Sequence, residues 1–326
     1  MSAVLVTGAT GFTGSHLARR LAGEGREVVA LVRPTSRVDS LQRLGIKCRA
    51  AALDERDSVR SCLEGVSEVY HLAAAFRAEH SDRAEFYRTN VAGTRHLLEA
   101  AREVGVRRFV HCSTVGVHGE IEDPPASESY RCKPGDYYQQ TKLEGELAAL
   151  EYMGRGLAVT VVRPTGIYGP GDGRFLKLFK AISSGWFVMV GSGQTLYHMT
   201  YVEDLVDGLL LAGEVPDAVG EVFIIAGERY TTLQRLVNLT ADALGATHPR
   251  LKLPYPPVYA ASVVCDRLFR AVGANPPLYP RRVEFFAKDR AFDISKAKEV
   301  LGYRPKDSLE EGLAKTAQWY RENGLL

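Results

Sequence analysis

The fold is decided near the N-terminus by the stretch AVLVTGATGFTGSHLARRLA, which occupies residues 3–22. Its first five residues predict a buried strand, and residues 15–22 have the apolar spacing of a helix. Gly8, Gly11 and Gly14 lie between these two segments. Glycine lets the backbone turn tightly and approach a pyrophosphate closely, while the N–H groups at the start of the next helix favour its negative charge. This context predicts a dinucleotide-binding site, with a tight strand-to-helix turn that binds nothing as the alternative.

The first half of the chain continues as short β-rich runs separated by segments of helical composition. The predicted strands are residues 4–7, 27–32, 69–72, 109–113 and 159–163. Such alternation is typical of a parallel sheet that is covered by helices on both faces. We therefore predict an α/β fold, a Rossmann-type doubly wound parallel sheet with a smaller C-terminal α/β region for the substrate.

The second half of the chain is less regular. Gly and Pro residues cluster after Ile167, and the alternation of strands and helices weakens. We expect an NAD(P)-binding Rossmann domain at residues 1–165 and a mainly substrate-binding region at residues 166–326. Residues 222–226 again have the composition of a buried strand, so part of residues 195–226 is expected to complete the first sheet.

Composition places the chain among ordinary globular proteins, with 326 residues of which 45% are apolar and 25% are charged. Forty-one basic and 39 acidic residues, without a block of like charge, argue against a nucleic-acid partner. The five cysteines form no Cys-x-x-Cys pair, so we expect neither a disulfide framework nor a metal site. The N-terminus lacks a signal-type segment, and charges interrupt the apolar residues 258–272. We expect a cytoplasmic protein with no membrane partner.

The end of the second predicted strand distinguishes between the two nicotinamide dinucleotides. An acidic residue there binds the adenosine ribose of NAD, whereas an arginine accommodates the 2′-phosphate of NADP. This chain has Arg33 and Arg37 and no carboxylate at that point, which favours NADP and leaves NAD as an option. Two solvated surface arginines are the alternative. Asp54 is a candidate adenine contact and equally a candidate helix N-cap.

A tyrosine and a lysine four residues apart form the candidate catalytic pair. On a helix, Tyr138 and Lys142 lie on one face within a turn of each other. A phenol with a pKa of about 10 is a poor base at neutral pH, and a neighbouring cation stabilises its phenolate form. Tyr138 would then exchange a proton with a substrate hydroxyl while hydride moves to or from a nicotinamide. The spacing alone is common on exposed amphipathic helices.

Further motifs follow along the chain in a fixed order. They are HLAAA at residues 71–75, TNVAGT at 89–94, STVGVHG at 113–119, RPTGIYGP at 163–170, YVEDL at 201–205, DISKA at 293–297 and LGYRP at 301–305. With the glycine turn and the Tyr138/Lys142 pair, they make nearly all of the chain similar to the extended short-chain dehydrogenase/reductase family. That family contains the NAD-dependent epimerases and dehydratases.

The resemblance implies roles for individual residues. Thr114 matches the catalytic Ser/Thr, whose hydroxyl bonds the substrate oxygen, and Lys142 would also bond the nicotinamide ribose. Asn90 lies near the active centre in relatives, with a structural hydrogen-bonding role as the alternative. The expected cofactor-binding residues are Gly8, Thr10, Gly11, Phe12, Gly14, Leu53, Ala73, Ala74, Ala75, Asn90, Ser113, Tyr138, Lys142, Pro164 and Thr165, together with Arg33, Arg37 and Asp54.

Some positions of this chain differ from the motifs of the family, and these differences limit the reactions that we expect. Val115 and Gly116 stand where the sugar dehydratases have an Asp-Glu pair, so dehydration and the related decarboxylation are disfavoured. Gly166 and Tyr197 stand where the nucleotide-sugar enzymes have an Asn and an Arg for the diphosphate. Loss of a bidentate arginine removes a contact worth roughly 1.5–3 kcal/mol. Other cations in suitable regions are Arg174, Lys177, Arg281 and Arg282.

We therefore predict an enzyme that transfers hydride reversibly at a secondary alcohol or ketone of a small substrate, as the hydroxysteroid dehydrogenase and dihydroflavonol reductase branches of the family do. The main alternative is a nucleotide-sugar epimerase with a tightly bound NAD(P) and a transient keto intermediate. A non-catalytic NADP(H)-binding regulator is a further alternative, against which the intact Thr114, Tyr138 and Lys142 argue. The resemblance is compatible with a homodimer, and the helix-like residues 258–272 are a candidate lid or subunit contact.

Overall fold

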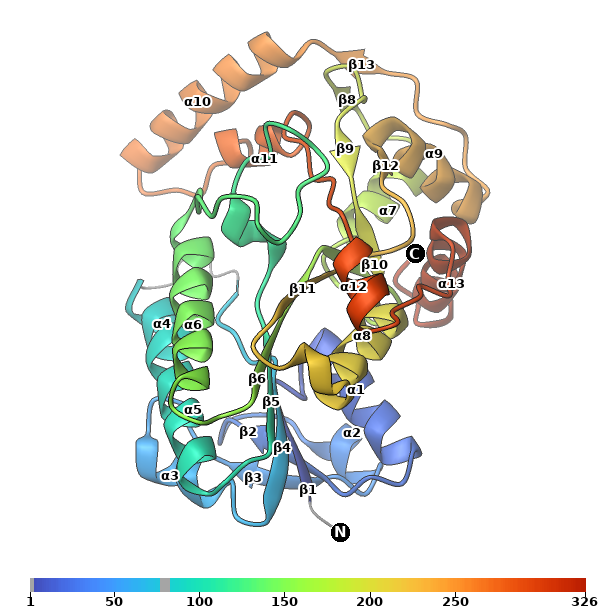
Figure 1. The fold of residues 1–326 in the computed structure, drawn as a ribbon. Helices are drawn as coiled ribbons and strands as arrows, with labels where there is room; N and C mark the ends of the chain where they lie inside the picture. Colours follow the sequence, from blue (N-terminus) through green and yellow to red (C-terminus); the bar gives the residue numbers. More distant parts are fainter. Residues whose placement is uncertain (1–2, 77–82) are drawn as a thin grey trace.

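The computed structural model describes residues 3–76 and 83–326, and a sheet of seven parallel strands lies at its centre (Figure 1). The order across the sheet is β11-β6-β5-β4-β1-β2-β3. The strands are β1 (Ala3–Thr7), β2 (Val28–Val32), β3 (Lys47–Ala50), β4 (Val66–His71), β5 (Arg108–Cys112), β6 (Val159–Pro164) and β11 (Val222–Ile225). The direction of winding reverses between β1 and β4, which places the ligand-binding switch point of a doubly wound sheet beside the glycine turn.

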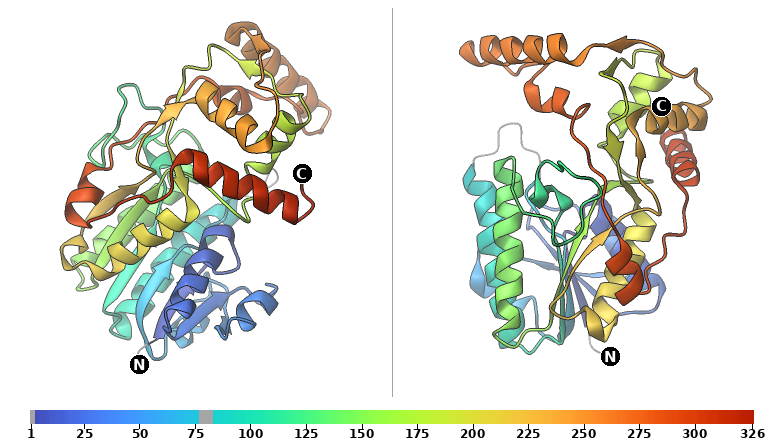
Figure 2. Two further views of the ribbon diagram at one scale, coloured as in Figure 1. Left: turned by 90° about the vertical axis from the view of Figure 1, so that its right-hand side faces the viewer. Right: turned by 45° about the horizontal axis from the view of Figure 1, so that its top comes forward.

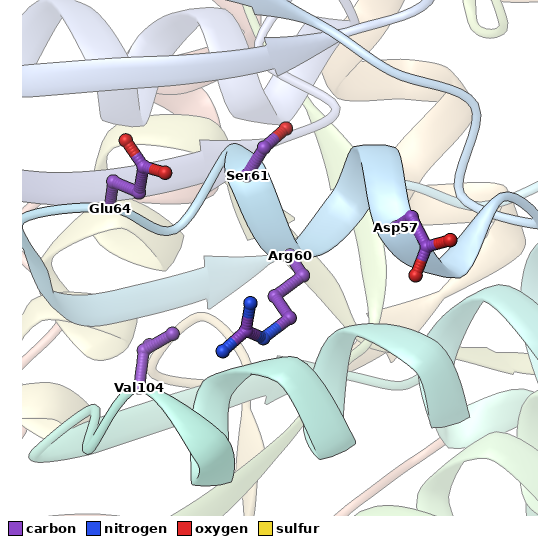
Figure 3. Close-up of a pocket in the computed structure, with 5 residues that line it drawn as sticks. All are labelled: Asp57, Arg60, Ser61, Glu64 and Val104. Carbon is purple, nitrogen blue, oxygen red and sulfur yellow. The ribbon is translucent and has the colours of Figure 1, made fainter.

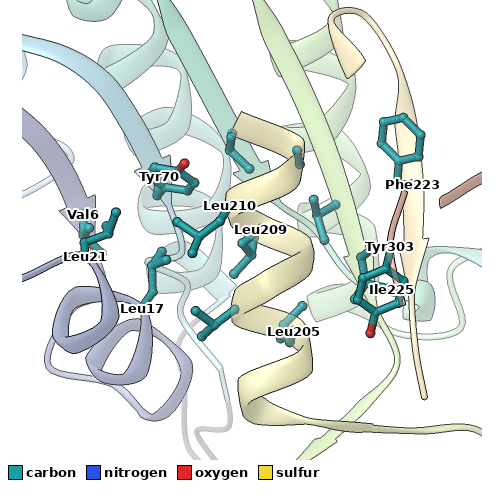
Figure 4. Packing of buried hydrophobic residues seen from close by; sticks show 14 of the residues in the cluster. Val6, Leu17, Leu21, Tyr70, Leu205, Leu209, Leu210, Phe223, Ile225 and Tyr303 are labelled. Carbon is teal, nitrogen blue, oxygen red and sulfur yellow. The ribbon is translucent and has the colours of Figure 1, made fainter. Parts of the chain in front are cut away.

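Helices cover both faces of the sheet because successive strand residues point to opposite sides. Val4 and Val6 pack on one face, against α1 (Phe12–Gly23), α8 (Val202–Glu214) and α12 (Ser295–Val300). Figure 4 shows this cluster, in which Leu17 and Leu21 of α1 meet Leu209 and Leu210 of α8 beside Tyr70. The residue between the two valines, Leu5, packs on the opposite face. The helices of that face are α3 (Arg56–Ser61), α5 (Gly93–Glu103) and α6 (Tyr137–Met153).

Much of the chain beyond β6 builds a smaller layer above the carboxyl ends of the strands (Figure 1), whereas β11, α8 and α12 belong to the main sheet and its cover. Its strand pairs are β7 (Gly166–Tyr168) with β10 (Met199–Tyr201), β9 (Leu196–Tyr197) with β12 (Thr231–Thr232), and β8 (Met189–Val190) with β13 (Lys252–Leu253). A separate core containing Phe179, Leu236 and Tyr320 joins α7 (Leu176–Ser183), α9 (Leu233–Leu244) and α13 (Leu309–Glu322). The remaining helices are α2 (Asp39–Gln42), α4 (Arg83–Tyr87) with a following π-helical turn (Arg88–Ala92), α10 (Tyr255–Ala271) and α11 (Pro280–Glu284).

The predicted fold class is confirmed, and each predicted strand occurs in the sheet. Residues 222–225 join it as β11, with Ile225 opposite Pro164 of β6. Strand β3 was not predicted, because it lies at the edge of the sheet and its residues are exposed or half-buried rather than apolar and alternating. Helices α8 and α12 come from the second half of the chain and still pack on the first sheet. The division at residues 165 and 166 therefore stays a prediction.

In the described ranges, residues 3–76 and 83–326, no helix has both the length and the apolar character needed to cross a membrane. Each of the five cysteines lies in these ranges and is unpaired. Burial raises the pKa of the Cys112 thiol to about 11, so this thiol at the end of β5 stays neutral and protonated at physiological pH.

Candidate active site

The glycine turn after β1 is so compact that two of its positions exclude a side chain. Gly8 has a φ of +71°, and a Cβ there would lie 2.8 Å from the backbone nitrogen of Ala73. A Cβ on Gly14 would lie 2.1 Å from the carbonyl oxygen of Gly8. These two glycines let the start of α1 approach β1 and the chain that follows β4, as the predicted turn requires.

The N-terminus of α1 is suited to an anion. Gly11 is the N-cap residue, and among the described residues no side chain hydrogen-bonds to the cap position. The first turn, which begins at Phe12, carries no acidic residue. Its first N–H groups therefore point out of the helix without intrahelical acceptors, and the helix dipole adds positive potential. This turn fits the pyrophosphate of a dinucleotide, and the exposed Thr10 and Gly11 border it.

A buried hydrogen-bond chain fixes the loop after β4 beside the glycine turn. Thr7 Oγ1 accepts from the backbone N–H groups of Leu72 and Ala73, both at 3.1 Å. It lies 2.7 Å from His71 Nδ1, so its single proton goes to that nitrogen. Burial lowers the pKa of His71 to about 3, and the neutral ring can donate from Nε2 to Thr94 Oγ1 at 2.9 Å. This chain holds Ala73 where the resemblance places the cofactor.

Asn90 connects the same loop to α6. Its Oδ1 accepts from the backbone N–H of Ala75 at 2.8 Å, and its Nδ2 donates to Thr141 Oγ1 at 3.0 Å. Thr141 donates in turn to the backbone carbonyl of Tyr138 at 2.9 Å. The structural role that the sequence left open for Asn90 is therefore present, because this side chain positions both the loop and the first turn of α6.

The pair Tyr138 and Lys142 lies in the first two turns of α6, which packs against β6. The helix begins after Asp136, whose Oδ1 accepts from the backbone N–H of Gln139 at 2.8 Å. Lys142 Nζ donates to the carbonyl oxygen of Cys112 at 2.7 Å, which brings the ammonium group to the carboxyl end of β5. Burial lowers the pKa of Lys142. Two of its three ammonium protons remain for a ribose or a substrate.

Aromatic rings border the phenol of Tyr138. The Phe76 ring packs edge-on against it with centroids 5.4 Å apart, and the Phe86 ring packs similarly at 6.2 Å. Burial raises the pKa of Tyr138 above its usual value, and the guanidinium groups of Arg174 and Arg281 only partly oppose the rise. The phenol is therefore protonated at neutral pH in this structure. The predicted lowering of its pKa by Lys142 stays a prediction.

Ser113 and Thr114 follow β5 and have different partners. Ser113 donates to Glu146 Oε2 at 2.6 Å, and Glu146 is ion-paired with Arg163 inside the protein, so Ser113 is held in a buried network. Thr114 caps the short 3₁₀ turn Val115–His118, and its Oγ1 accepts from the backbone N–H of Gly116 at 3.1 Å. Because this oxygen acts as an acceptor, the hydroxyl proton of Thr114 is left for another oxygen.

The candidate adenosine-binding residues lie at the ends of β2 and β3. Thr7 pairs with Leu31, so Arg33 follows the end of β2 beside the glycine turn. Arg33 and Arg37 are exposed, and neither has an ion-pair partner among the described residues. Asp54 is exposed with a carboxyl oxygen 3.9 Å from Arg88 Nε, and the N-cap of α3 is Glu55. The alternative of Asp54 as a helix cap is therefore wrong.

The remaining predicted positions lie along the same edge. The carbonyl oxygen of Leu53 accepts from His96 Nδ1 at 3.1 Å, which holds the chain after β3 against α5. Pro164 is the last residue of β6, and Thr165 is buried with its Oγ1 2.5 Å from Thr200 Oγ1. The fold thus brings the glycine turn, the loop after β4, the end of β5 and the end of β6 to one edge of the sheet.

The structure places Arg174 beside two aromatic rings of the site, which its sequence position did not predict. Its Nε donates to Asp172 Oδ1 at 2.9 Å, and its Nη2 donates to the carbonyl oxygen of Ile167 at 2.6 Å. Its guanidinium carbon lies 5.7 Å from the Phe12 ring centroid and 5.8 Å from that of Phe76. Sequence reasoning missed Phe76 and Phe86, because no motif predicts which loop side chains fold over the phenol.

Figure 3 shows a surface hollow that is not part of this site. Asp57, Arg60, Ser61, Glu64 and Val104 line it. Glu64 and Val104 precede β4 and β5, so the hollow lies at the amino ends of the strands, opposite the candidate active site. Its Arg60 is paired with Glu103 at 3.0 Å.

The fold and this edge define a dinucleotide-binding enzyme class, and the comparisons with known proteins identify the family. The family model described as the NAD dependent epimerase/dehydratase family matches residues 4–226. The chain therefore belongs to that family, whose members are nicotinamide-dependent dehydrogenases, reductases and epimerases.

Curated relatives match the chain over almost its whole length. Sterol demethylase protein B of Methylococcus capsulatus is 31% identical over 336 residues, which cover 99% of each chain. A putative dihydroflavonol 4-reductase of Synechocystis is 30% identical and covers 98% of this chain and 95% of its own.

Solved structures agree with the fold. The crystal structure of gox2253 superimposes with a TM-score of 0.85 at 30% identity and covers 100% of both chains. The structure of MoeE5 in complex with UDP-glucuronic acid and NAD has a TM-score of 0.77 at 30% identity, with 98% of this chain and 99% of that chain covered. NAD is thus the dinucleotide bound in a similar structure.

Proposed function

We propose that this protein is an NADP(H)-dependent oxidoreductase that reversibly converts a secondary alcohol and a ketone on an apolar small molecule. The observation that carries the proposal is the phenol of Tyr138, which is bordered by Phe76 and Phe86 and lies one helical turn from Lys142. Its hydroxyl has no hydrogen-bond partner among the described residues, so it is available to a substrate oxygen.

The bound nicotinamide supplies or accepts the hydride, and the chain's own residues handle the proton. Tyr138 is protonated at neutral pH and therefore donates its proton to the carbonyl oxygen in the reduction direction. The free hydroxyl proton of Thr114 is suited to hold the same oxygen. Lys142, anchored through one proton to Cys112, retains two for the ribose and orients the ring.

The preference for NADP is supported by the charges at the end of β2. Arg33 and Arg37 are solvent-exposed and have no ion-pair partners among the described residues, so no internal contact must break for them to bind a 2′-phosphate. A charge-assisted hydrogen bond of this kind contributes roughly 1.5–3 kcal/mol. The other cofactor contacts are proposed for the positions named above along the carboxyl edge.

Two observations support an apolar substrate. Aromatic rings border the phenol of Tyr138, and the arginine with which nucleotide-sugar enzymes bind a diphosphate is replaced. Tyr197, at the position where nucleotide-sugar enzymes have an arginine, is buried and donates its hydroxyl proton to the carbonyl of Phe285. Val115 and Gly116 supply no carboxylate for elimination. The relatives named for a sterol and for dihydroflavonol agree in substrate character, so we propose a fused-ring alcohol or ketone. Residues 166–326 would contribute most of the substrate contacts.

A nucleotide-sugar epimerase is the second candidate, and a specific observation favours it. The similar MoeE5 structure contains a UDP-sugar, and Arg174 of this chain lies over the aromatic rings beside Tyr138, where a cation could meet a diphosphate. We propose the cytoplasm as the compartment on the basis of the five unpaired cysteines, and a homodimer stays a prediction.

Purification and denaturation of the protein, followed by an assay of the supernatant for nicotinamide nucleotide, distinguishes between these functions. An oxidoreductase exchanges its cofactor at each turnover, so we expect an empty site and oxidation of added NADPH with a keto-steroid or a dihydroflavonol. Stoichiometric retained NAD(P) with conversion of a UDP-sugar would establish the epimerase instead. Cofactor binding without turnover of any of these compounds would favour the regulator.

A further inference from the structure

Exposed apolar side chains gather at one end of the molecule. Thirteen large apolar residues are exposed in the described ranges, and seven of them lie on or beside β8, β13 and α10. They are Trp186, Leu251, Leu253, Val264, Leu268, Phe269 and Val272. Figures 1 and 2 show β8, β13 and α10 at the end farthest from the N-terminus, where α10 extends beyond the rest of the molecule. We call these seven residues the apolar tip.

Helix α10 presents an apolar stripe on its free face. Pro257, Ala261, Val264, Leu268 and Val272 are spaced by three or four residues, so they lie along one side of the helix. All five are exposed, and Leu268 and Val272 retain 63% and 77% of their accessible surface. The opposite side faces the body of the protein.

The side of α10 opposite the stripe holds the helix against the protein. Ser262 is its one buried residue, and α10 packs against α11. Since one side of the helix is already packed, the exposed stripe is not needed to hold α10 in place. Its apolar surface therefore needs another explanation.

The charges around the tip have one predominant sign. Residues 250–272 contain Arg250, Lys252, Arg267 and Arg270 against the single acidic residue Asp266, whereas the whole chain has only two more basic than acidic residues. Asp266 is paired with Arg270 at 2.9 Å. Arg267 is exposed and has no ion-pair partner among the described residues.

We propose that the apolar tip docks on the surface of an anionic lipid bilayer, with α10 lying in the plane of the headgroups. An apolar stripe flanked by arginines is the pattern of helices that bind at this interface, and an exposed tryptophan such as Trp186 is enriched there. The protein then lies on the membrane surface, since no helix within residues 3–76 and 83–326 is suited to cross a bilayer. This proposal differs from the sequence-based expectation of no membrane partner, because a sequence does not show which apolar side chains the fold leaves exposed.

The same observations disfavour a second copy of the chain as the occupant. A two-fold contact would bring the same patch of both copies together, and hence their unpaired cations. Anionic headgroups instead complement those cations, and each basic side chain near such a surface adds to the attraction. The proposal is independent of the reaction proposed above, because docking requires neither cofactor nor substrate.

Flotation of the full-length protein with vesicles tests the proposal. We expect binding to phosphatidylcholine vesicles that contain phosphatidylglycerol, at low salt and without cofactor, and much weaker binding to pure phosphatidylcholine. Leu268→Asp should weaken binding at least about tenfold, because burial of one leucine is lost. Arg267→Glu should weaken it by about 30-fold, because two units of charge are exchanged.

Matched controls separate docking from general surface effects. Leu147 on α6 is 55% exposed and far from the tip along the chain, so Leu147→Asp should bind vesicles like the unmodified protein. The chain has two tryptophans, and Trp319→Phe leaves Trp186 as the only one, whose emission should shift to the blue on binding. Unchanged thermal unfolding of Leu268→Asp shows that the variant is folded.

Three results would overturn the proposal. The first is no binding to anionic vesicles, and the second is binding that Leu268→Asp and Leu147→Asp weaken equally. The third is self-association, measured by sedimentation, that Leu268→Asp abolishes while vesicles remain unbound, because the tip would then be an interface between copies.

Discussion

The phenol of Tyr138 allows a sharp test, because Tyr137 provides a neighbouring control on the same helix. Tyr138→Phe removes one oxygen and keeps the ring that packs against Phe76 and Phe86. Tyr137→Phe is the identical chemical change one residue earlier. The Tyr137 ring lies against Phe86 and under the guanidinium of Arg83, at 5.2 Å from the ring centroid.

The two substitutions should differ in activity and agree in stability. A positioned proton donor contributes roughly 10²- to 10⁴-fold to the rate, so Tyr138→Phe should raise the barrier by about 3–5 kcal/mol. Its hydroxyl has no hydrogen-bond partner among the described residues, so the free energy of unfolding should change by no more than about 0.5 kcal/mol. Tyr137→Phe should leave kcat within about twofold, because its oxygen has no role in the proposed proton transfer.

NADPH oxidation with the ketone substrate measures the first effect, and thermal unfolding measures the second. Dissociation constants for NADPH should be similar in all three proteins, since the cofactor contacts are intact. Equal losses of activity in the two variants, or full activity in Tyr138→Phe, would refute the assignment of Tyr138 as the proton donor.

Cofactor preference, pH dependence and the packing of the glycine turn can each be tested in the same way. Arg33→Asp should shift the ratio of NADP to NAD affinities toward NAD by roughly 10- to 100-fold in dissociation-constant measurements, and an unchanged ratio would remove the argument for NADP. Burial raises the pKa of Tyr138, and its protonated form donates the proton in the reduction direction. The kcat/KM for the ketone should therefore be level from about pH 6 to 9 and fall only at higher pH. A fall in kcat/KM near pH 7 would contradict this expectation. Gly14→Ala should destabilise the fold by about 1–3 kcal/mol in chemical denaturation, because its Cβ would lie 2.1 Å from the Gly8 carbonyl oxygen. Gly23→Ala in the same helix is the control. Its Cβ meets nothing within 4 Å, so this change should be neutral or stabilising.

The sheet could be predicted from the sequence because its central strands are buried on both faces. β1 and β2 are runs of five consecutive buried residues, which is typical of central strands in a parallel sheet, and β1 leads directly into the glycine turn. β3 has no such signal, since Lys47 and Ala50 are exposed at the edge. Its pairing with β2 comes from the tertiary fold and not from its own pattern.

The candidate site also contains residues that the sequence could predict and residues that it could not. The first group stands in motifs, and the second depends on how the loops fold. Gly8, Asn90 and Lys142 stand in ordered motifs, and the fold gathers their neighbourhoods at one edge of the sheet. Phe76 follows a motif by one residue and Phe86 lies in α4, and neither position has a spacing that links it to Tyr138. Their contact with the phenol depends on loop conformation, which local sequence does not determine.

The charges that act on the pKa of Tyr138 could not be predicted from the spacing of residues along the chain. Four residues on a helix place Lys142 on the same side as Tyr138, but the ammonium donates to the Cys112 carbonyl. Arg174 and Arg281, from distant parts of the chain, are the cations that act on the phenol. Burial outweighs them, and burial is a property of the folded protein.

Transfer of deuterium from NADPH that carries the label on the nicotinamide C4 tests the proposed reaction most directly. With a fused-ring ketone as substrate, we expect the unmodified protein to form an alcohol with one deuterium on the carbinol carbon, and we expect Tyr138→Phe to lose this activity. Label that stays on the nucleotide while a UDP-sugar is epimerised by a retained cofactor would contradict it.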